Sequence, residues 1–242
     1  MNHELFFLDP MFTDQQLSDL ENLSLEDALK EVTEAFPEGV VFSTSLGQED
    51  QVLTHVIARQ HLPIKIFTLD TGRLFNEHYE LLEKTNARYK INIQTYFPEA
   101  SDIEKYVSEK GINGFYESVE NRKECCFLRK VKPLNRALEG ARVWITGLRA
   151  EQSDNRKGMR MLEWDESRSL YKLNPLIHWS YDQMIQYIRE HNIPYNPLHD
   201  KGFISIGCAP CTRAIEPGED ARAGRWWWEA SHKECGLHVN KA

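Results

Sequence analysis

Four cysteines in two pairs are the residues whose types and spacing most clearly indicate chemistry. Cys208 and Cys211 form a Cys-x-x-Cys motif, and Cys125 and Cys126 are adjacent far upstream. Four thiols that converge on one point could bind a metal centre or a cluster. The fifth cysteine, Cys235, would then remain as a free and reactive thiol.

The spacing by itself leaves the kind of centre open. A Cys-x-x-Cys motif is shared by zinc sites, redox dithiols and chance occurrences. Zinc ribbons usually use two such motifs, whereas two adjacent cysteines must point their side chains apart to reach one centre. Because a wide cluster tolerates this better than a single ion does, the pattern favours iron and sulfur over zinc.

Length and composition predict a globular protein of one sizeable domain or at most two small ones. The chain has 242 residues, and 41% of them are hydrophobic. No apolar run approaches the ~20 residues that cross a bilayer, and the acidic N-terminus does not resemble a signal peptide. An odd number of cysteines without a secretory segment argues against a disulfide framework. We therefore expect a cytoplasmic protein without a membrane partner.

The charge is unevenly distributed along the chain. The net charge is -8, yet residues 121–160 contain eleven Lys or Arg against four Asp or Glu. A local basic segment in an acidic protein indicates a small anionic ligand, since nucleic acid would require a broad positive face. The alternative is that these cations are simply solvated.

Strands and helices alternate along the chain. Strands are expected at residues 40–42, 64–69, 91–96 and 142–146, with a hairpin at 160–164 and 169–173. Helices are expected at 25–36, after the loop at 43–50, at 75–87, 101–110 and 180–191. Asp14 is expected to cap a short helix before these, and another helix should begin at or just after the adjacent cysteines and run to Leu138. This order predicts an α/β fold with a doubly wound, mostly parallel sheet.

Polar loops follow several of these strands, where ligands bind in such sheets. The strand, Ser/Gly loop and helix at residues 40–57 can hold a phosphate on loop amides, although many α/β proteins have such turns without a ligand. Residues 1–36 read as a helical segment, 37–200 as a nucleotide-binding core and 201–242 as an extended C-terminal tail. We expect these three parts to form one structural domain.

Taken together, the motifs resemble the sulfonucleotide reductases, and within them the iron-sulfur type of assimilatory adenylyl-sulfate (APS) reductase. The motifs are Cys125-Cys126, Gly207-Cys-Ala-Pro-Cys-Thr, Gly224-Arg-Trp-Trp-Trp-Glu, Glu234-Cys-Gly-Leu-His, Leu69-Asp-Thr-Gly-Arg and Gly147-Leu-Arg-Ala-Glu-Gln-Ser. The likeness extends from about residue 25 to the end of the chain.

The resemblance implies an adenine-nucleotide α-hydrolase-like fold, a 4Fe-4S cluster and the thioredoxin-dependent reduction of APS to sulfite and AMP, with glutaredoxin as another candidate reductant. It makes Cys125, Cys126, Cys208 and Cys211 the cluster ligands. Cys235 becomes the nucleophile, which passes through an S-sulfo intermediate. The substrate-binding positions that it implies are Ser43, Ser45, Gly47, Leu69, Lys130, Gly147, Arg156, Arg222, Arg225 and His238.

Several alternatives stay open at this point. The 3'-phosphorylated substrate (PAPS) is one, since Arg149 and Lys157 could hold an additional phosphate, and assembly into a homo-oligomer is another. An ATP-using PP-loop enzyme is disfavoured because the loop at 43–50 departs from the Ser-Gly-Gly-x-Asp-Ser pattern. A zinc-stabilised nucleotide-binding module is the non-enzymatic alternative.

Overall fold

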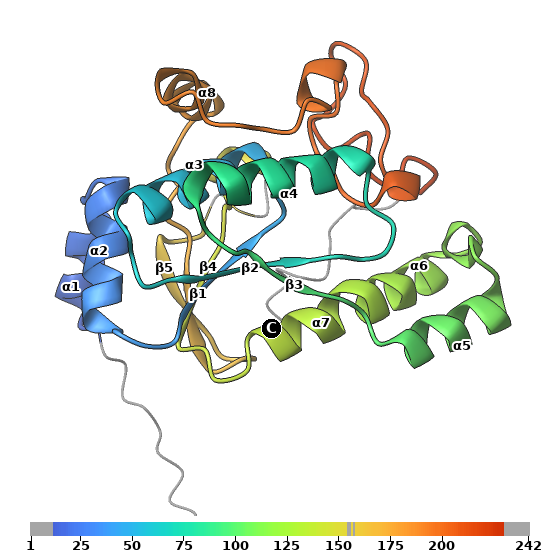
Figure 1. Cartoon of the computed structure of the whole chain (residues 1–242), viewed down its shortest axis with the longest axis horizontal. Helices are drawn as coiled ribbons and strands as arrows, with labels where there is room; N and C mark the ends of the chain where they lie inside the picture. Colours follow the sequence, from blue (N-terminus) through green and yellow to red (C-terminus); the bar gives the residue numbers. More distant parts are fainter. Residues whose placement is uncertain (1–11, 154–155, 157, 230–242) are drawn as a thin grey trace, which may run out of the picture.

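The computed structural model describes residues 12–153, 156 and 158–229 (Figure 1). In this part of the chain, six strands form one sheet with the order β3-β2-β1-β4-β6-β5. The strands are β1 (Val40–Thr44), β2 (Lys65–Leu69), β3 (Gln94–Tyr96), β4 (Val143–Ile145), β5 (Leu162–Asp165) and β6 (Leu170–Leu173). All neighbouring pairs are parallel except β5 with β6, which form the predicted hairpin.

Helices cover both faces of this sheet, with α3 and α4 on one side and α5, α6 and α7 on the other (Figure 1). The helices are α1 (Asp14–Leu20), α2 (Leu25–Ala35), α3 (Gln48–Arg59), α4 (Asn76–Tyr89), α5 (Ala100–Lys110), α6 (Val119–Cys126), α7 (Lys132–Ala137) and α8 (Tyr181–Glu190). Helix α8 packs on α3, and α7 packs on β2 and β3. The prediction of a doubly wound, mostly parallel sheet is therefore confirmed.

Two apolar clusters hold these layers together. The larger joins α2, α3 and α8 to one face of the sheet, and Leu29, Val32 and Phe42 in it are fully buried. The smaller lies on the opposite face, where Leu134 of α7 packs on Phe67 and Trp144. Because both faces are covered, the central strands are apolar along most of their length, as buried parallel strands are.

Two boundaries differ from the sequence prediction. The strand expected at 91–96 begins only at Gln94, because the amides of Ile91 and Ile93 are bonded to the backbone and side chain of Asn86 and cannot join the ladder. Helix α1 is capped by the hydroxyl of Thr13, which accepts from the Gln16 amide, so the prediction of Asp14 as the cap was wrong.

The helix that carries the adjacent cysteines also differs. It begins at Val119 after the cap Ser118, so Cys125 and Cys126 lie at the end of α6 rather than at the start of a helix. A π-helical turn, Phe127–Val131, then connects α6 to α7. The sequence of α6 is almost entirely polar, and only Arg122 in it is buried, so it offers no apolar period to detect.

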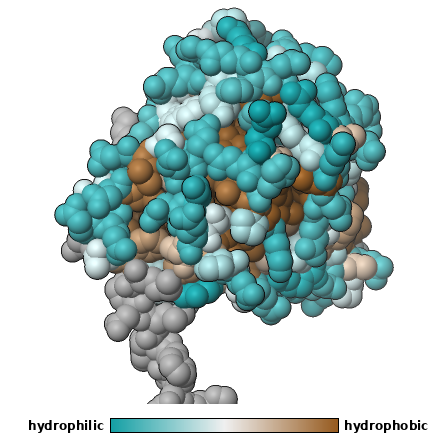
Figure 2. All heavy atoms as spheres, turned by 60° about the vertical axis from the view of Figure 1, so that its left-hand side comes forward, coloured by the Kyte–Doolittle hydropathy of each residue, from teal (hydrophilic) through white to brown (hydrophobic). Residues whose placement is uncertain are grey.

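The surface on the side of the N-terminal helices is mostly hydrophilic, with hydrophobic residues visible mainly in a band across its middle (Figure 2). Among the described residues, none of the helices has the combination of length and apolar character that spanning a bilayer requires.

Candidate functional site

A cavity of about 540 Å³ lies at the carboxyl ends of β1, β2 and β4. Nine of the ten substrate-binding positions expected from the sequence line it. These are Ser43, Ser45, Gly47, Leu69, Lys130, Gly147, Arg156, Arg222 and Arg225. The tenth, His238, lies outside the described residues, as does Cys235. Parallel strands thus bring loops separated by more than 100 positions to one crevice.

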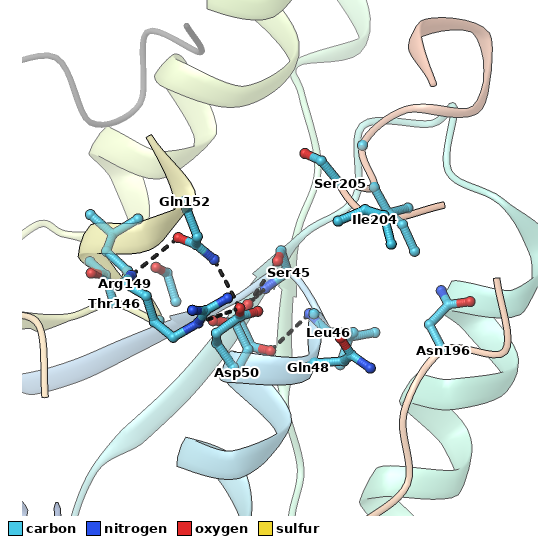
Figure 3. A pocket seen from close by; sticks show the side chains of 18 of the residues that line it. Ser45, Leu46, Gln48, Asp50, Thr146, Arg149, Gln152, Asn196, Ile204 and Ser205 are labelled. Atoms are coloured by element: carbon cyan, nitrogen blue, oxygen red, sulfur yellow. Dashed lines mark hydrogen bonds and ion pairs between the residues drawn. The ribbon is translucent and has the colours of Figure 1, made fainter. Parts of the chain in front are cut away.

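The loop after β1 is arranged around the carboxylate of Asp50, which lies in the first turn of α3. Asp50 accepts hydrogen bonds from the backbone amide of Ser45 at 2.5 Å and from its hydroxyl at 2.7 Å. The expectation that these amides face a ligand phosphate is therefore wrong for Ser45, whose amide is bonded to Asp50. Figure 3 shows Asp50 and Ser45 facing each other at the centre of the cavity wall. Burial raises the pKa of the Asp50 carboxyl from 3.8 to about 6.

Gly147, which follows β4, allows the close approach of Asp50. A Cβ atom at this position would lie 2.2 Å from Oδ1 of Asp50, well inside contact distance. The glycine is therefore required by the loop across the crevice, in addition to any contact that it makes with a ligand.

Arg149 binds acidic residues of its own chain. Its Nε donates to Oε1 of Glu49 at 2.9 Å, and its Nη1 donates to Oε2 of Glu151 at 3.0 Å. Gln152 donates to the same oxygen of Glu49, so the loops after β1 and β4 are tied together (Figure 3). The hypothesis that Arg149 could hold an additional phosphate is therefore disfavoured. Lys157, the other cation considered, is outside the described residues.

The opposite wall contains residues that the sequence did not reveal. Asn196, Ile204 and Ser205 face the loops from across the cavity (Figure 3), and His78 and His199 also line it. Burial lowers the pKa of His78 to about 4 and also lowers the pKa of His199, so it favours the neutral form of both imidazoles. The clustering of polar residues within 196–205 was the only sequence feature that could have indicated this wall. His78 lies inside an ordinary helix, where nothing in the sequence distinguishes it.

A second, smaller cavity of about 20 Å³ is lined by the four paired cysteines. Cys125 and Cys126 come from α6, and Cys208 and Cys211 come from the short helical turn Ala209–Cys211 and its cap. Arg73, Arg122, Arg129 and Lys130 also line this cavity. The predicted convergence of the four thiols is therefore what the structure shows.

The surroundings shift the pKa values of the two Cys-x-x-Cys thiols in opposite directions. Burial alone would raise the pKa of the Cys208 thiol, but Lys130, the Thr71 hydroxyl at 3.3 Å and the guanidinium groups of Arg225 and Arg129 together lower it. Burial and the neighbouring thiols of Cys208 and Cys126 raise the pKa of Cys211 to about 12. Within the described ranges, no group of three or more His, Cys, Asp or Glu residues is arranged to hold a metal ion.

Comparison with known proteins agrees with this arrangement. The phosphoadenosine phosphosulfate reductase domain matches residues 39–214. The chain belongs to this family. The loops after β1, β2 and β4 and the Cys-x-x-Cys motif lie inside the matched range, whereas the cavity residues Arg222 and Arg225 lie beyond it.

Relatives in this family are close in sequence. The chain is 55% identical over 202 residues to the adenosine 5'-phosphosulfate reductase of Allochromatium vinosum, with 83% of this chain and 79% of the relative covered. It is 56% identical over 200 residues to the protein of the same name from Agrobacterium fabrum, with 82% and 77% covered.

Solved structures show the same fold. The phosphoadenylyl-sulfate reductase of Candida auris, in a phosphate complex, superposes with a TM-score of 0.70 at 27% identity, covering 82% of this chain and 97% of that one. Yeast FAD synthetase with bound FAD reaches a TM-score of 0.55 at 16% identity, covering 83% and 67%, and shows similarity of fold alone.

Asp50 should give the stability of the protein a specific pH dependence. Because its pKa is raised on folding, the folded state binds this proton more tightly than the unfolded state, so stability is lost as the pH rises from about 3.8 to about 6 and stays low above that. Lowering the pH from 7 to 4 therefore recovers about 2 kcal/mol at this residue. Asp50→Asn should lack that gain when free energies of unfolding in urea are compared at the two pH values.

Asp182→Asn is the control for loss of one charge, because Asp182 is an exposed carboxylate in the first turn of α8. An Asp50→Asn variant whose stability changes with pH as much as that of the wild type would contradict the assignment.

Proposed function

We propose that this chain reduces adenosine 5'-phosphosulfate to sulfite and AMP, the reaction after which its relatives are named. One observation carries the proposal. Lys130 lines both the large cavity and the thiol cavity, so the cationic end of a nucleotide-sized site lies directly beside four clustered cysteines. A volume of about 540 Å³ is also within the usual range for a small-molecule site.

The substrate would lie with its nucleoside against the strand ends and its anionic end at the thiols. Ser43, Leu69 and Gly147 of the cavity wall would contact the nucleoside, and the wall residues Lys130, Arg156, Arg222 and Arg225 would contact the anionic group. Because the phosphosulfate group is negative, it favours these four cations over the carboxylates of Glu49 and Asp50 in the loop after β1. His238 would add to these cations.

The cations would serve the chemistry of a phosphate-sulfate anhydride. The thiolate of Cys235 attacks the sulfur atom, the bond from sulfur to the phosphate oxygen breaks, and AMP departs with the bonding electron pair. Lysine and arginine side chains stabilise the charge that develops on the phosphate oxygens. Cys235 is left as an S-sulfocysteine.

Release of sulfite requires two electrons from a dithiol. A thiolate of the reductant attacks Sγ of Cys235, sulfite leaves with the electron pair, and a second thiol of the reductant resolves the mixed disulfide and regenerates Cys235. A low-potential dithiol protein such as thioredoxin, or alternatively a glutaredoxin, fits this step. Such a reductant operates in a reducing compartment, and we propose that this compartment is the cytoplasm.

For the thiol cavity we propose a 4Fe-4S cluster held by Cys125, Cys126, Cys208 and Cys211, although in the described residues these thiols are not grouped as ligands of a single metal ion. Four thiols from two segments supply the donor set, and cations surround them. Nε of Arg129 and the indole nitrogens of Trp226 and Trp228 are buried without a hydrogen-bond partner in the described residues, and cluster sulfides accept such bonds. When bound, the cluster would order the two segments and set the field beside Lys130.

The choice between APS and PAPS follows from the cations that the site offers. Because Arg149 is bonded to Glu49 and Glu151, it is poorly placed to take a 3'-phosphate. In an anaerobic assay of sulfite release with a dithiol reductant, kcat/KM for APS should exceed that for PAPS. Equal or better turnover of PAPS would overturn this preference, and release of pyrophosphate from ATP would instead indicate a PP-loop enzyme.

Loss of any one of the four paired thiols should remove the cluster. Each single Cys→Ser variant should lose iron, acid-labile sulfide and visible absorbance after anaerobic purification, because a 4Fe-4S cluster requires four thiolates. The control replaces Cys235, the cysteine that is not a proposed cluster ligand. The variant Cys235→Ser should keep its iron. Colourless wild-type protein containing zinc would favour a zinc-stabilised module.

Cys235→Ser should bind APS as the wild type does and lose sulfite formation by several orders of magnitude, since a hydroxyl is a far weaker nucleophile than a thiolate. Mass spectrometry of the wild-type peptide after incubation with APS, without reductant, should show an added sulfite unit on Cys235. An adduct on another cysteine, or substantial turnover by the variant, would disprove this mechanism.

A further inference from the structure

A fully buried ion pair joins the cysteine-bearing helix to the last described residue. Nε and Nη2 of Arg122 donate to the two carboxylate oxygens of Glu229, each at 2.8 Å. The two side chains are 4% and 3% exposed. They are 107 positions apart, so this contact fixes the relative placement of α6 and the C-terminal segment.

An aromatic ring strengthens the same junction. The guanidinium carbons of Arg122 and Arg225 lie 4.6 Å and 4.7 Å from the centroid of the Trp226 ring. Trp226 is 1% exposed, and its backbone is in the left-handed region with a φ of 42°. A non-glycine residue adopts this conformation at a cost, which surrounding contacts must offset. The packing of the Trp226 side chain between the two guanidinium groups therefore holds the backbone of Trp226 in one conformation.

The junction contacts both parts of the proposed active site. Arg122 lies one turn before Cys126 and interacts with its thiol, and the Trp226 amide donates to the Cys211 carbonyl at 3.2 Å. Arg225 lines the large cavity. Glu229 stands only six positions before Cys235. The pair is thus the last described contact before the chain continues to the proposed nucleophile.

Stability alone is a poor reason for such a pair. Removing two charges from water costs about as much as their attraction returns, and apolar residues of similar size often stabilise a protein equally well. A two-pronged pair between a guanidinium and a carboxylate does fix the plane and direction of both groups. A reactive thiol must be held in the correct orientation toward its substrate, so the chain that leads to it benefits from a fixed starting direction.

We propose that Arg122 and Glu229 are positioning residues for the transfer of the sulfo group. Their ion pair, with Trp226 held between Arg122 and Arg225, sets the direction in which the chain leaves the thiol cavity toward Cys235. The proposal rests on the proposed function. It assigns a part in setting the rate to Arg122 and Glu229, neither of which lines the large cavity.

The test is a single-turnover measurement of the adduct on Cys235 with saturating APS and no reductant. Glu229→Gln should slow adduct formation by about 10- to 100-fold, as misplacement of a reacting group does. The dissociation constant for APS should change by less than about threefold, because the nucleotide loops and Lys130 are unaltered. Thermal unfolding of each protein gives the folded fraction by which the rates are corrected.

Two further variants keep the test decisive. The double variant Arg122→Met with Glu229→Met removes both charges, so it leaves no lone buried charge to unfold the protein, and it should also form the adduct slowly. Asp165→Asn is the matched control. Asp165 is a carboxylate of the β5–β6 hairpin that is likewise 3% exposed. It pairs with Arg168, whose guanidinium carbon lies 5.4 Å from the ring centroid of Trp144 in β4. This control should lose stability and keep the adduct rate of folded enzyme within about twofold of the wild type.

The outcomes separate the two proposals. Wild-type rates in Glu229→Gln or in the double variant would overturn the positioning role alone. A fall in rate that is matched by Asp165→Asn after correction for folding would show a merely structural effect and overturn it too. A wild-type protein that forms neither adduct nor sulfite would overturn the proposed function, and this inference with it.

Discussion

The site depends on the parallel pairing of β1 with β2 on one side and with β4 on the other. In the register, Phe42 lies opposite Ile66 of β2 and Ile145 of β4, so the three strands end at the same edge. The loops that follow them open into one cavity. Because the chain order reverses at β1, the crossover helices leave on opposite faces and do not close this crevice. An antiparallel arrangement would have put neighbouring loops at opposite edges.

Within that crevice, charged side chains of both signs are tied to the loops. Asp50 occupies the Ser45 end of the loop after β1, and Glu49 binds Arg149 from the loop after β4. Arg156 donates to Gln152, which in turn donates to Glu49. Lys130 lines both this crevice and the thiol cavity. The anionic end of a ligand that reaches Lys130 therefore lies beside the cysteines.

The thiol cavity is assembled from segments that have little cohesion of their own. Helix α6 is polar, and the segment 207–229 has as regular structure the short helical turn Ala209–Cys211 and an isolated β-bridge between Thr212 and Arg225. They are held together by Phe115 and Trp226 packed around the cysteines, by the Arg122–Glu229 ion pair and by backbone bonds between 211–213 and 224–226. Gly207 allows Arg225 to pack closely against this segment. A Cβ atom at position 207 would lie 2.4 Å from the Arg225 guanidinium. Binding a cofactor between the four thiols would add to this cohesion and so link cofactor loading to the order of the region.

The sequence by itself determined the fold class and most strands, because apolar periods report local structure, while the convergence of the four cysteines and nine of the cavity-lining positions were predicted through the resemblance of its motifs to a known family. It did not show where α6 begins, since a polar helix has no apolar period. It also could not show that Asp50 takes the Ser45 amide, that Arg149 is bonded to acidic residues, or that His78 lies on the wall with Asn196 and His199. Only the tertiary structure decided these points and the pairing of Arg122 with Glu229. Such contacts join residues up to 107 positions apart, and their energy depends on burial and direction, which a linear pattern does not encode.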